Sequence, residues 1–146
     1  MKDSEIRARM CFELHSVAHL LRRNFDRRAK SYDLTRSRWQ ILWNLSREEG
    51  VKQAELADRM DVARISLTRQ LDLLEAEGLV ERRQDTEDRR CYRLYLTAAA
   101  APVLQVLQQL AEETRTEALA GLSAEEQRQL FGLISRVRNN VSRGEG

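Results

Sequence analysis

The sequence contains few of the residues that interrupt helices or carry covalent chemistry. Its 146 residues include one proline, six glycines, two cysteines and two histidines. So little proline and glycine favours long helices over a loop-rich chain. Cys11 and Cys91 are too few and too far apart for a disulfide framework, which indicates a reducing compartment. Because cysteine and histidine do not cluster, we expect neither a metal nor a cofactor.

Long apolar runs are also missing from the sequence. No stretch approaches the roughly 20 apolar residues of a membrane-spanning helix, and no signal peptide begins the chain. We therefore expect a cytoplasmic protein without a membrane partner. Hydrophobic residues make up 42% and charged residues 33% of the chain, but the net charge is only +2. A case for nucleic-acid binding must therefore rest on where the cations lie, not on their number.

The central feature of the sequence is a pair of short helices within residues 53–79. Leu67, Leu71 and Leu74 recur at i, i+4 and i+7 in the second helix, which is the spacing of a buried stripe. The turn between the two helices falls at Asp61. The corner of a helix-turn-helix needs a residue that tolerates a positive φ, and aspartate is one of the few besides glycine that do.

The outward face of the second helix predicts a DNA contact. A rotation of 100° per residue places Ile65, Arg69 and Asp72 opposite the leucine stripe, with Arg64 and Ser66 near the N-terminal end. The arginines can reach guanine or phosphate, the serine a base edge or phosphate, and the exposed isoleucine a thymine methyl. This is the pattern of a recognition helix that enters the major groove. The alternative is a solvated helix with ordinary charges.

The next segment is typical of a wing. Residues Val80–Gln84 and Cys91–Leu96 read as two strands, and the charged loop Asp85–Arg90 joins them. Adjacent arginines, Arg89 and Arg90, lie at the tip of this hairpin, where they can enter a narrow minor groove. The predicted fold is therefore mostly α with a small β-hairpin: a winged helix-turn-helix lobe with a helical dimerisation region.

Two helices precede this lobe and two follow it. The first covers residues 5–31, and the second covers residues 36–48 after an N-cap at Thr35. The third covers residues 97–120, and we expect it to bend or to start late because Pro102 removes a backbone hydrogen bond.

The final helix, residues 124–141, begins at a capping box formed by Ser123 and Glu126. The apolar stripes of the first and the last two helices exceed what a small winged helix can cover, so we expect them to pack together and against a second copy. Two-fold symmetry then places two recognition helices roughly 34–36 Å apart, to match a palindromic site on double-stranded DNA. The predicted domains are an N-terminal dimerisation helix (1–34), a winged helix (35–97) and C-terminal dimerisation helices (98–146).

Two rival classes of function receive less support. An enzyme would need a phosphate-binding glycine loop, a metal-ligand spacing or a Ser/His/Asp set, and the sequence offers none of these. We therefore expect no catalysis. A winged-helix adaptor that binds only proteins would not need Arg89 at a hairpin tip.

These features resemble the MarR family of bacterial transcriptional regulators over nearly the whole chain. The resemblance rests on the helix order, on ISLTRQLDLLEAEGLVERR, and on the wing DTEDRR running into YRLYLT. The segments LTRSRWQILWNL and ETRTEALAGLSAEEQRQL are similar to the SlyA-like group within that family. The resemblance implies a homodimeric transcription factor, in which Ser66 and Arg69 contact the major groove and Arg89 contacts the minor groove.

The resemblance also implies a charge network that ties the wing to the recognition helix. Its members are Asp72, Arg82 and Arg90, and Asp88 is a further wing-anchoring candidate. A carboxylate between guanidinium groups would fix a mobile loop and preorganise the tip arginine. Alternatively, Asp72 and Arg82 form only a surface ion pair, worth about 0–1 kcal/mol.

The family further implies an effector, since many members release DNA when a small aromatic acid binds. That site usually lies where the dimerisation helices meet the DNA-binding lobe, and an arginine with aromatic faces can hold a planar carboxylate. In the alternative interpretation the tryptophans pack in the core and the histidines make dimer contacts. The candidate effector-binding residues are His15, His19, Arg38, Trp39 and Trp43.

Redox sensing is a second form of control to consider. Cys11 lies early in the first helix, where one branch of the family carries a peroxide-sensing cysteine. That branch pairs its cysteine with tyrosines, and the corresponding places hold Phe25 and Arg36 here. Without phenol hydroxyls to stabilise a thiolate, Cys11 is better interpreted as an apolar filler.

Overall fold

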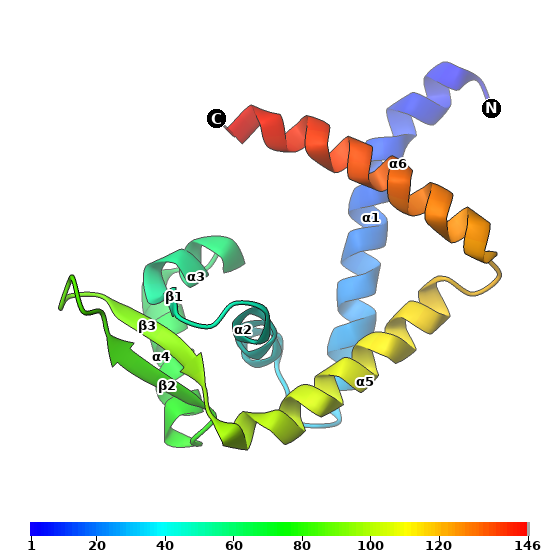
Figure 1. Cartoon of the computed structure of the whole chain (residues 1–146). Coiled ribbons are helices and arrows are strands. Elements are labelled where there is room, and N and C mark those ends of the chain that lie inside the picture. Colours follow the sequence, from blue (N-terminus) through cyan, green and yellow to red (C-terminus); the bar gives the residue numbers. More distant parts are fainter. Residues whose placement is uncertain (146) are drawn as a thin grey trace. The chain divides into compact units, whose positions relative to one another are not determined.

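The computed structural model describes residues 1–145, which form six α-helices and one small antiparallel sheet (Figure 1). This mostly helical winged-helix architecture confirms the predicted fold class. The chain divides into two compact units, residues 1–112 and residues 113–146. Among the described residues, every helix is too short or too polar to cross a membrane. The elements are α1 (Asp3–Lys30), α2 (Arg36–Arg47), β1 (Val51–Lys52), α3 (Gln53–Met60), α4 (Arg64–Ala76), β2 (Val80–Gln84), β3 (Tyr92–Leu96), the 3-10 helix η1 (Ala98–Ala100), α5 (Ala101–Ala118), α6 (Ala124–Ser142) and the 3-10 helix η2 (Arg143–Glu145).

The helix-turn-helix is formed by α3 and α4, as predicted. Asp61 ends α3 in the left-handed conformation, with φ 52° and ψ 48°. Leu67, Leu71 and Leu74 on α4 are at most 1% exposed, and they face the core of the first unit. Ile65, on the opposite face of α4, is 66% exposed. The leucine stripe therefore fixes the rotation of α4 and leaves its other face to solvent.

The core of the first unit joins the winged helix to parts of the flanking helices. α2 contributes its whole apolar face, and the C-terminal end of α1 and the first half of α5 pack against the same cluster. Because burial of this surface drives folding, the cluster fixes the orientation of α3, α4 and the sheet. Its largest fully buried side chains are Ile41, Leu42, Leu45, Leu56, Leu67, Leu71, Leu74, Val80, Leu94 and Leu107.

The sheet has three strands in the order β1-β3-β2, one more than the predicted hairpin. In its register Val51 lies opposite Leu94, and Val80 lies opposite Leu96. The hairpin of β2 and β3 matches the prediction to within one residue. β1 was missed because two residues are too few to show an alternating pattern, and because its partner strand lies about 40 residues further along the chain. Gly50 begins this pairing, since its N–H donates to the Leu94 carbonyl at 2.8 Å.

The helix ends follow the local signals in the sequence. The Thr35 hydroxyl accepts a hydrogen bond from the Arg38 N–H at 3.4 Å, which confirms the predicted cap. In the capping box of α6, Ser123 N–H donates to Glu126 Oε2 at 2.8 Å, and Glu126 N–H donates to Ser123 Oγ at 3.1 Å. Pro102 lies in the first turn of α5, after η1, where its missing N–H costs no hydrogen bond. The α-helix therefore starts late, at Ala101.

Two helices keep apolar faces exposed in a single chain. On α1 the exposed large apolar side chains include Ile6, Met10, Val17 and Leu21, which recur at intervals of four or seven residues, as in the stripe expected for this helix. α6, in the second unit, also exposes an apolar set. Its members are Leu130, Phe131, Leu133, Ile134, Val137 and Val141.

Gly50 provides a test of the turn before β1. Its φ is +80°, and an added Cβ would lie 3.2 Å from Tyr95 Oη. Gly78 has a similar φ of +76°, with no atom of the described chain within 4 Å of such a Cβ. Gly78→Ala should therefore lose about 1–2 kcal/mol of unfolding free energy through backbone strain alone. Gly50→Ala should lose more, and chemical denaturation measures both. Equal losses would show that Tyr95 does not constrain the turn.

Candidate nucleic-acid interface

The N-terminal half of α4 presents the residues predicted to contact bases. Arg64, Ser66 and Arg69 are exposed, as is Ile65. In the part of the chain that the structure describes, the guanidinium groups of Arg64 and Arg69 make no ion pair. The N-terminal half of the helix therefore offers two uncommitted cations, one hydroxyl and one apolar side chain to solvent.

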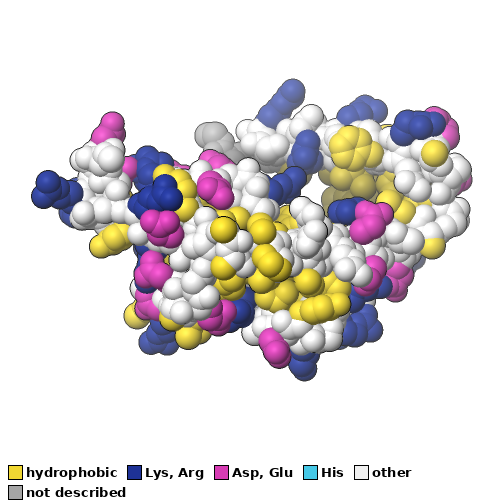
Figure 2. Space-filling view, turned by 60° about the horizontal axis from the view of Figure 1, so that its bottom comes forward, with side chains coloured by type: hydrophobic (Ala, Val, Ile, Leu, Met, Phe, Trp, Pro, Cys, Tyr) yellow, Lys and Arg dark blue, Asp and Glu magenta, His cyan; other side chains and the backbone are white. Residues whose placement is uncertain are grey.

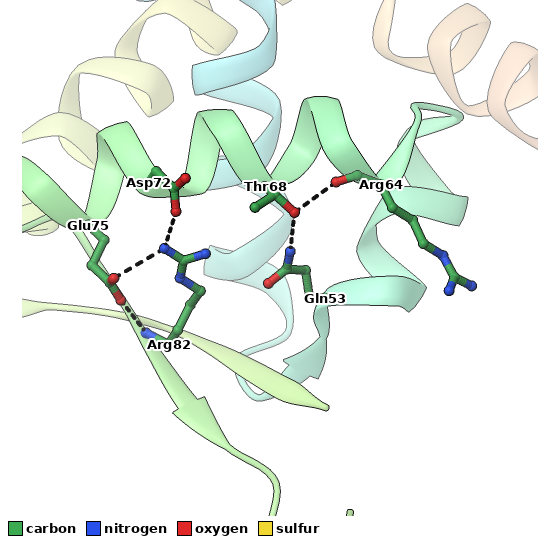
Figure 3. Close-up of polar contacts among 6 residues, drawn as sticks. All are labelled: Gln53, Arg64, Thr68, Asp72, Glu75 and Arg82. Carbon is green, nitrogen blue, oxygen red and sulfur yellow. Dashed lines mark hydrogen bonds and ion pairs between the residues drawn. The ribbon is translucent and has the colours of Figure 1, made fainter. Parts of the chain in front are cut away.

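A hydrogen-bonded chain fixes the first turns of α4 to α3 (Figure 3). The Gln53 amide Nε2 donates to Thr68 Oγ1 at 2.9 Å, and the Thr68 hydroxyl donates to the Arg64 carbonyl at 2.9 Å. Figure 3 shows the Arg64 side chain pointing away from these contacts. Sequence reasoning missed Gln53 and Thr68, because a contact between side chains 15 residues apart leaves no periodic signal. The pair holds the helix that carries Arg64 without engaging its guanidinium.

Arg82 on β2 connects the sheet to the later turns of α4 (Figure 3). Its guanidinium pairs with Asp72, as predicted, and Nη2 also lies 3.2 Å from Glu75 Oε1. The Arg82 N–H donates to Glu75 Oε2 at 3.1 Å. These hydrogen bonds from Arg82 hold the pKa of the Glu75 carboxyl below its ordinary value. Glu75 was missed, although it lies one helical turn after Asp72 on the same face.

The predicted network is wrong for Arg90. This residue pairs with Asp88 in its own loop: its N–H lies 3.0 Å and its Nε 3.1 Å from Asp88 Oδ1. Arg90 reaches the carboxylate of Asp88, two residues away, without the entropy cost of ordering a distant segment. This explains why it pairs with the local partner. Asp88 therefore stabilises the loop itself, while Asp72 and Arg82 form a separate connection.

The tip arginine remains uncommitted. Arg89 is exposed, and its carbonyl accepts a hydrogen bond from Gln84 Nε2 at 2.6 Å. Within residues 1–145 its guanidinium makes no ion pair. Figure 1 shows the hairpin of β2 and β3 projecting beyond α4, so its loop is free to meet a second surface.

A buried carboxylate at the base of the wing was not predicted. Asp85 is 6% exposed, and it accepts hydrogen bonds from Arg93 Nε at 2.7 Å and from the Asp88 N–H at 3.2 Å. Arg93 Nη1 in turn donates to the Gly50 carbonyl at 2.8 Å. The guanidinium of Arg93 holds the pKa of the Asp85 carboxyl below its ordinary value. The wing is thus tied to the turn before β1.

A small notch separates the start of α4 from the wing. It has a volume of about 240 Å³. Three of its lining residues are cations, Lys52, Arg64 and Arg90, and Tyr92 adds a phenol. None of the described lining residues carries a carboxylate. Sequence reasoning did not find Lys52, because it lies in the unpredicted strand β1. The other residues that line the notch are Gln53, Ala54 and Cys91.

Figure 2 shows basic and acidic side chains interleaved on the face that it presents, with no uniformly basic surface. This agrees with the small net charge of +2. The capacity of the molecule to hold DNA therefore depends on which cations lack a carboxylate partner.

The proposed effector residues do not face one another. Arg38 points to the end of α4, where Nη1 donates to Glu77 Oε1 at 2.6 Å and Nη2 donates to the other oxygen. Its neighbour Trp39 points to α1: Nε1 donates to Asp26 Oδ1 at 2.8 Å, and its ring lies 4.6 Å from that of Phe25. Trp43 also packs against the core, whereas His15 and His19 are exposed on α1.

Both cysteines are free thiols. Cys11 is exposed on α1, so its interpretation as an apolar filler is wrong for the single chain. Arg36, at one of the two places where the redox-sensing branch has tyrosines, pairs with Asp26. The Cys91 thiol lies 3.5 Å from Asp88 Oδ2. No group of three or more His, Cys, Asp and Glu residues in the described chain is placed to hold a metal ion.

The chain is similar to known transcriptional regulators over most of its length. A model of the MarR family matches residues 34–92. The structure of the transcriptional regulator PA3341 is 30% identical and covers 92% of this chain and 98% of its own, with a TM-score of 0.79. Wild-type apo MarR from E. coli is 26% identical over 85% of this chain and 92% of its own, with a TM-score of 0.76. The transcriptional regulator SlyA is 27% identical over 92% and 95%, with a TM-score of 0.75.

A winged helix with one exposed face of α4 and a projecting wing is an architecture typical of DNA-binding transcriptional regulators. Together with the matches above, it shows that the chain belongs to the MarR family. Regulation of transcription, and not catalysis, is the activity that this family membership supports.

The titration of Asp85 tests the anchor at the base of the wing. Its folded pKa is depressed, so the pair with Arg93 contributes stability above the unfolded pKa of about 4, and this contribution is lost as the pH falls through the lowered value. Carboxyl ¹³C NMR should show the low pKa directly. Arg93→Gln should return the pKa to its ordinary range, whereas Arg83→Gln on β2 should not. An ordinary pKa in the unchanged protein would contradict the anchor.

Proposed function

We propose that the protein is a homodimer that regulates transcription by binding a palindromic DNA site. Each α4 enters a major groove, and each wing, residues 85–90, enters the adjacent minor groove. One observation carries this proposal. The arginines at the proposed contact positions, Arg64, Arg69 and Arg89, have no carboxylate partner in the described chain, whereas the supporting Arg82 and Arg93 are paired.

The exposed apolar faces of α1 and α6 support a dimer. Isolated apolar side chains on a surface need no explanation, but a contiguous face marks an interaction site. We infer that a second copy covers them. A closed two-fold pair then presents two identical recognition helices, and half-sites about one DNA turn apart follow from this symmetry.

We also propose that a small aromatic acid releases the DNA. A pocket of about 340 Å³ supports this, because its size suits a small organic molecule and most of its lining is apolar. Of the five effector candidates, Arg38 lines this pocket, and Arg38 is therefore the residue that we retain as the carboxylate ligand. The other lining residues are Tyr32, Leu34, Glu77, Leu79, Pro102, Val103 and Val106.

Selection of bound duplexes from a random DNA pool tests the proposal. We expect a palindrome with half-sites one turn apart, and a dimer mass by analytical ultracentrifugation. Arg89→Ala should weaken binding to the selected site at least tenfold, because the minor-groove contact is lost in both protomers. Arg128→Ala, on α6 outside the winged helix, removes the same charge and should have little effect. A protein-binding adaptor would enrich no sequence and would tolerate Arg89→Ala.

The same proposal gives the notch beside α4 a role, since it lies between the two elements that enter the grooves. We infer that it receives a backbone phosphate, and that Lys52 contacts this phosphate. Lys52→Gln should therefore reduce the slope of log K against log salt concentration by about 1 per protomer, and it should leave the preferred sequence unchanged. Lys2→Gln makes the same charge change at the start of α1. A slope equal in both variants would exclude Lys52 from phosphate binding.

A further inference from the structure

The pair of Arg38 and Glu77 connects the effector pocket to the recognition helix. Arg38 lies in the first turn of α2, and Glu77 is the C-cap residue of α4. The guanidinium donates two parallel hydrogen bonds to the two carboxylate oxygens. This fork is the geometry in which arginine holds the carboxylate of a bound ligand. Glu77 therefore occupies the position that an acidic ligand would take.

The surroundings of the pair suit an acid with an apolar body. Both residues line the pocket of about 340 Å³, together with Leu79, Pro102 and Val106. The pair thus supplies charge at one point of an otherwise largely apolar wall. A ligand with a carboxylate at one end and a ring at the other matches this distribution.

Arg38 also has an unused donor. Its Nε is buried and has no hydrogen-bond partner within the described residues. A buried N–H without an acceptor is costly and uncommon in folded proteins, and an absent ion or ligand is one of its ordinary explanations. Glu77 accepts only from Nη1 and Nη2, so Nε gains an acceptor only if the pair rearranges.

The last turns of α4 join this pocket to the wing. Glu77 follows Glu75 by two residues, and Glu75 with Asp72 holds Arg82 on β2. Any event that releases Glu77 from α2 therefore acts on the same segment of α4 that positions the sheet and its loop. The pair is partly exposed, with side-chain exposures of 20% for Arg38 and 42% for Glu77, so it can open without unfolding the core.

We propose that Glu77 is an internal competitor of the effector. An organic acid in the pocket displaces the Glu77 carboxylate from Arg38, satisfies Nε, and frees the C-terminal end of α4, so that DNA affinity falls. This inference rests on the proposed function, since it assumes that α4 reads DNA and that the effector is an acid. It adds the residue that couples the two sites, because acid and DNA then favour opposite states of one ion pair.

Glu77→Gln tests the proposal, with benzoate as the ligand and uncharged benzamide as its control. The glutamine side chain of the variant carries no charge and competes weakly for Arg38. Benzoate should therefore bind the variant about tenfold more tightly than the unchanged protein. DNA affinity without benzoate should fall several-fold, and saturating benzoate should no longer lower it further. Titration calorimetry measures the acid, and fluorescence anisotropy of the selected duplex measures the DNA. Benzamide should bind neither protein.

Glu48→Gln is the matched control. It removes an exposed carboxylate that pairs with Arg59 at 2.7 Å within the same unit, and it should change neither affinity. If the unchanged protein selects no DNA sequence, the proposed function itself fails. If it binds DNA specifically but Glu77→Gln behaves like Glu48→Gln, the function stands and the competition is excluded.

A measurement on the unchanged protein removes any dependence on how the variant folds. The hydrogen bond from Arg38 holds the pKa of the Glu77 carboxyl below its ordinary value. Saturating benzoate should return this pKa to the ordinary range, as seen by carboxyl ¹³C NMR, while benzamide should not. A pKa that stays depressed in the benzoate complex would show that the acid leaves the pair intact.

Discussion

The rotation of α4 about its own axis is the constraint on which the interface depends. Once Leu67, Leu71 and Leu74 are buried, each remaining position has a fixed direction, because residues follow at 100° intervals. Ile65 is then held at 66% exposure, and Arg64 and Ser66 beside it are also exposed. The left-handed turn at Asp61 supports this arrangement, since it lets α3 and α4 cross while both bury their apolar sides.

The effect of charge on this molecule depends on which arginines are paired with carboxylates. Lysine and arginine outnumber the acids by only two, 25 against 23, so no broad positive field separates one face from another. What distinguishes the interface is that the structural arginines, such as Arg82 and Arg93, are held by carboxylates while the exposed ones are not. Paired guanidinium groups position the segments, and unpaired ones remain available to phosphates and bases. A protein of small net charge can thus present DNA contacts without a strongly basic surface.

The features that were predicted correctly from the sequence depend on interactions between residues close together in the chain. The cap at Thr35, the capping box at Ser123 and the conformation of Asp61 each depend on residues within about four positions. The features that were missed join distant segments: β1 pairs with β3, and Arg38 meets Glu77 39 residues later. Such partners are chosen by the tertiary fold, which single-sequence patterns do not encode. Arg90 shows the opposite error, since a family resemblance suggested a distant partner where Asp88 in the same loop was closer.

The ion pairs around the end of α4 suit a regulator that must change state. Coupling between two ligands typically amounts to about 1–3 kcal/mol. An exposed pair contributes about 0–1 kcal/mol, and a bidentate arginine pair lies toward the upper end of that range. Replacing the core contacts of Leu67 or Leu74 would cost several times more and would unfold the lobe. The proposed competition therefore uses Arg38 and Glu77, whose contacts are weak enough to be exchanged while the leucine stripe keeps α4 folded.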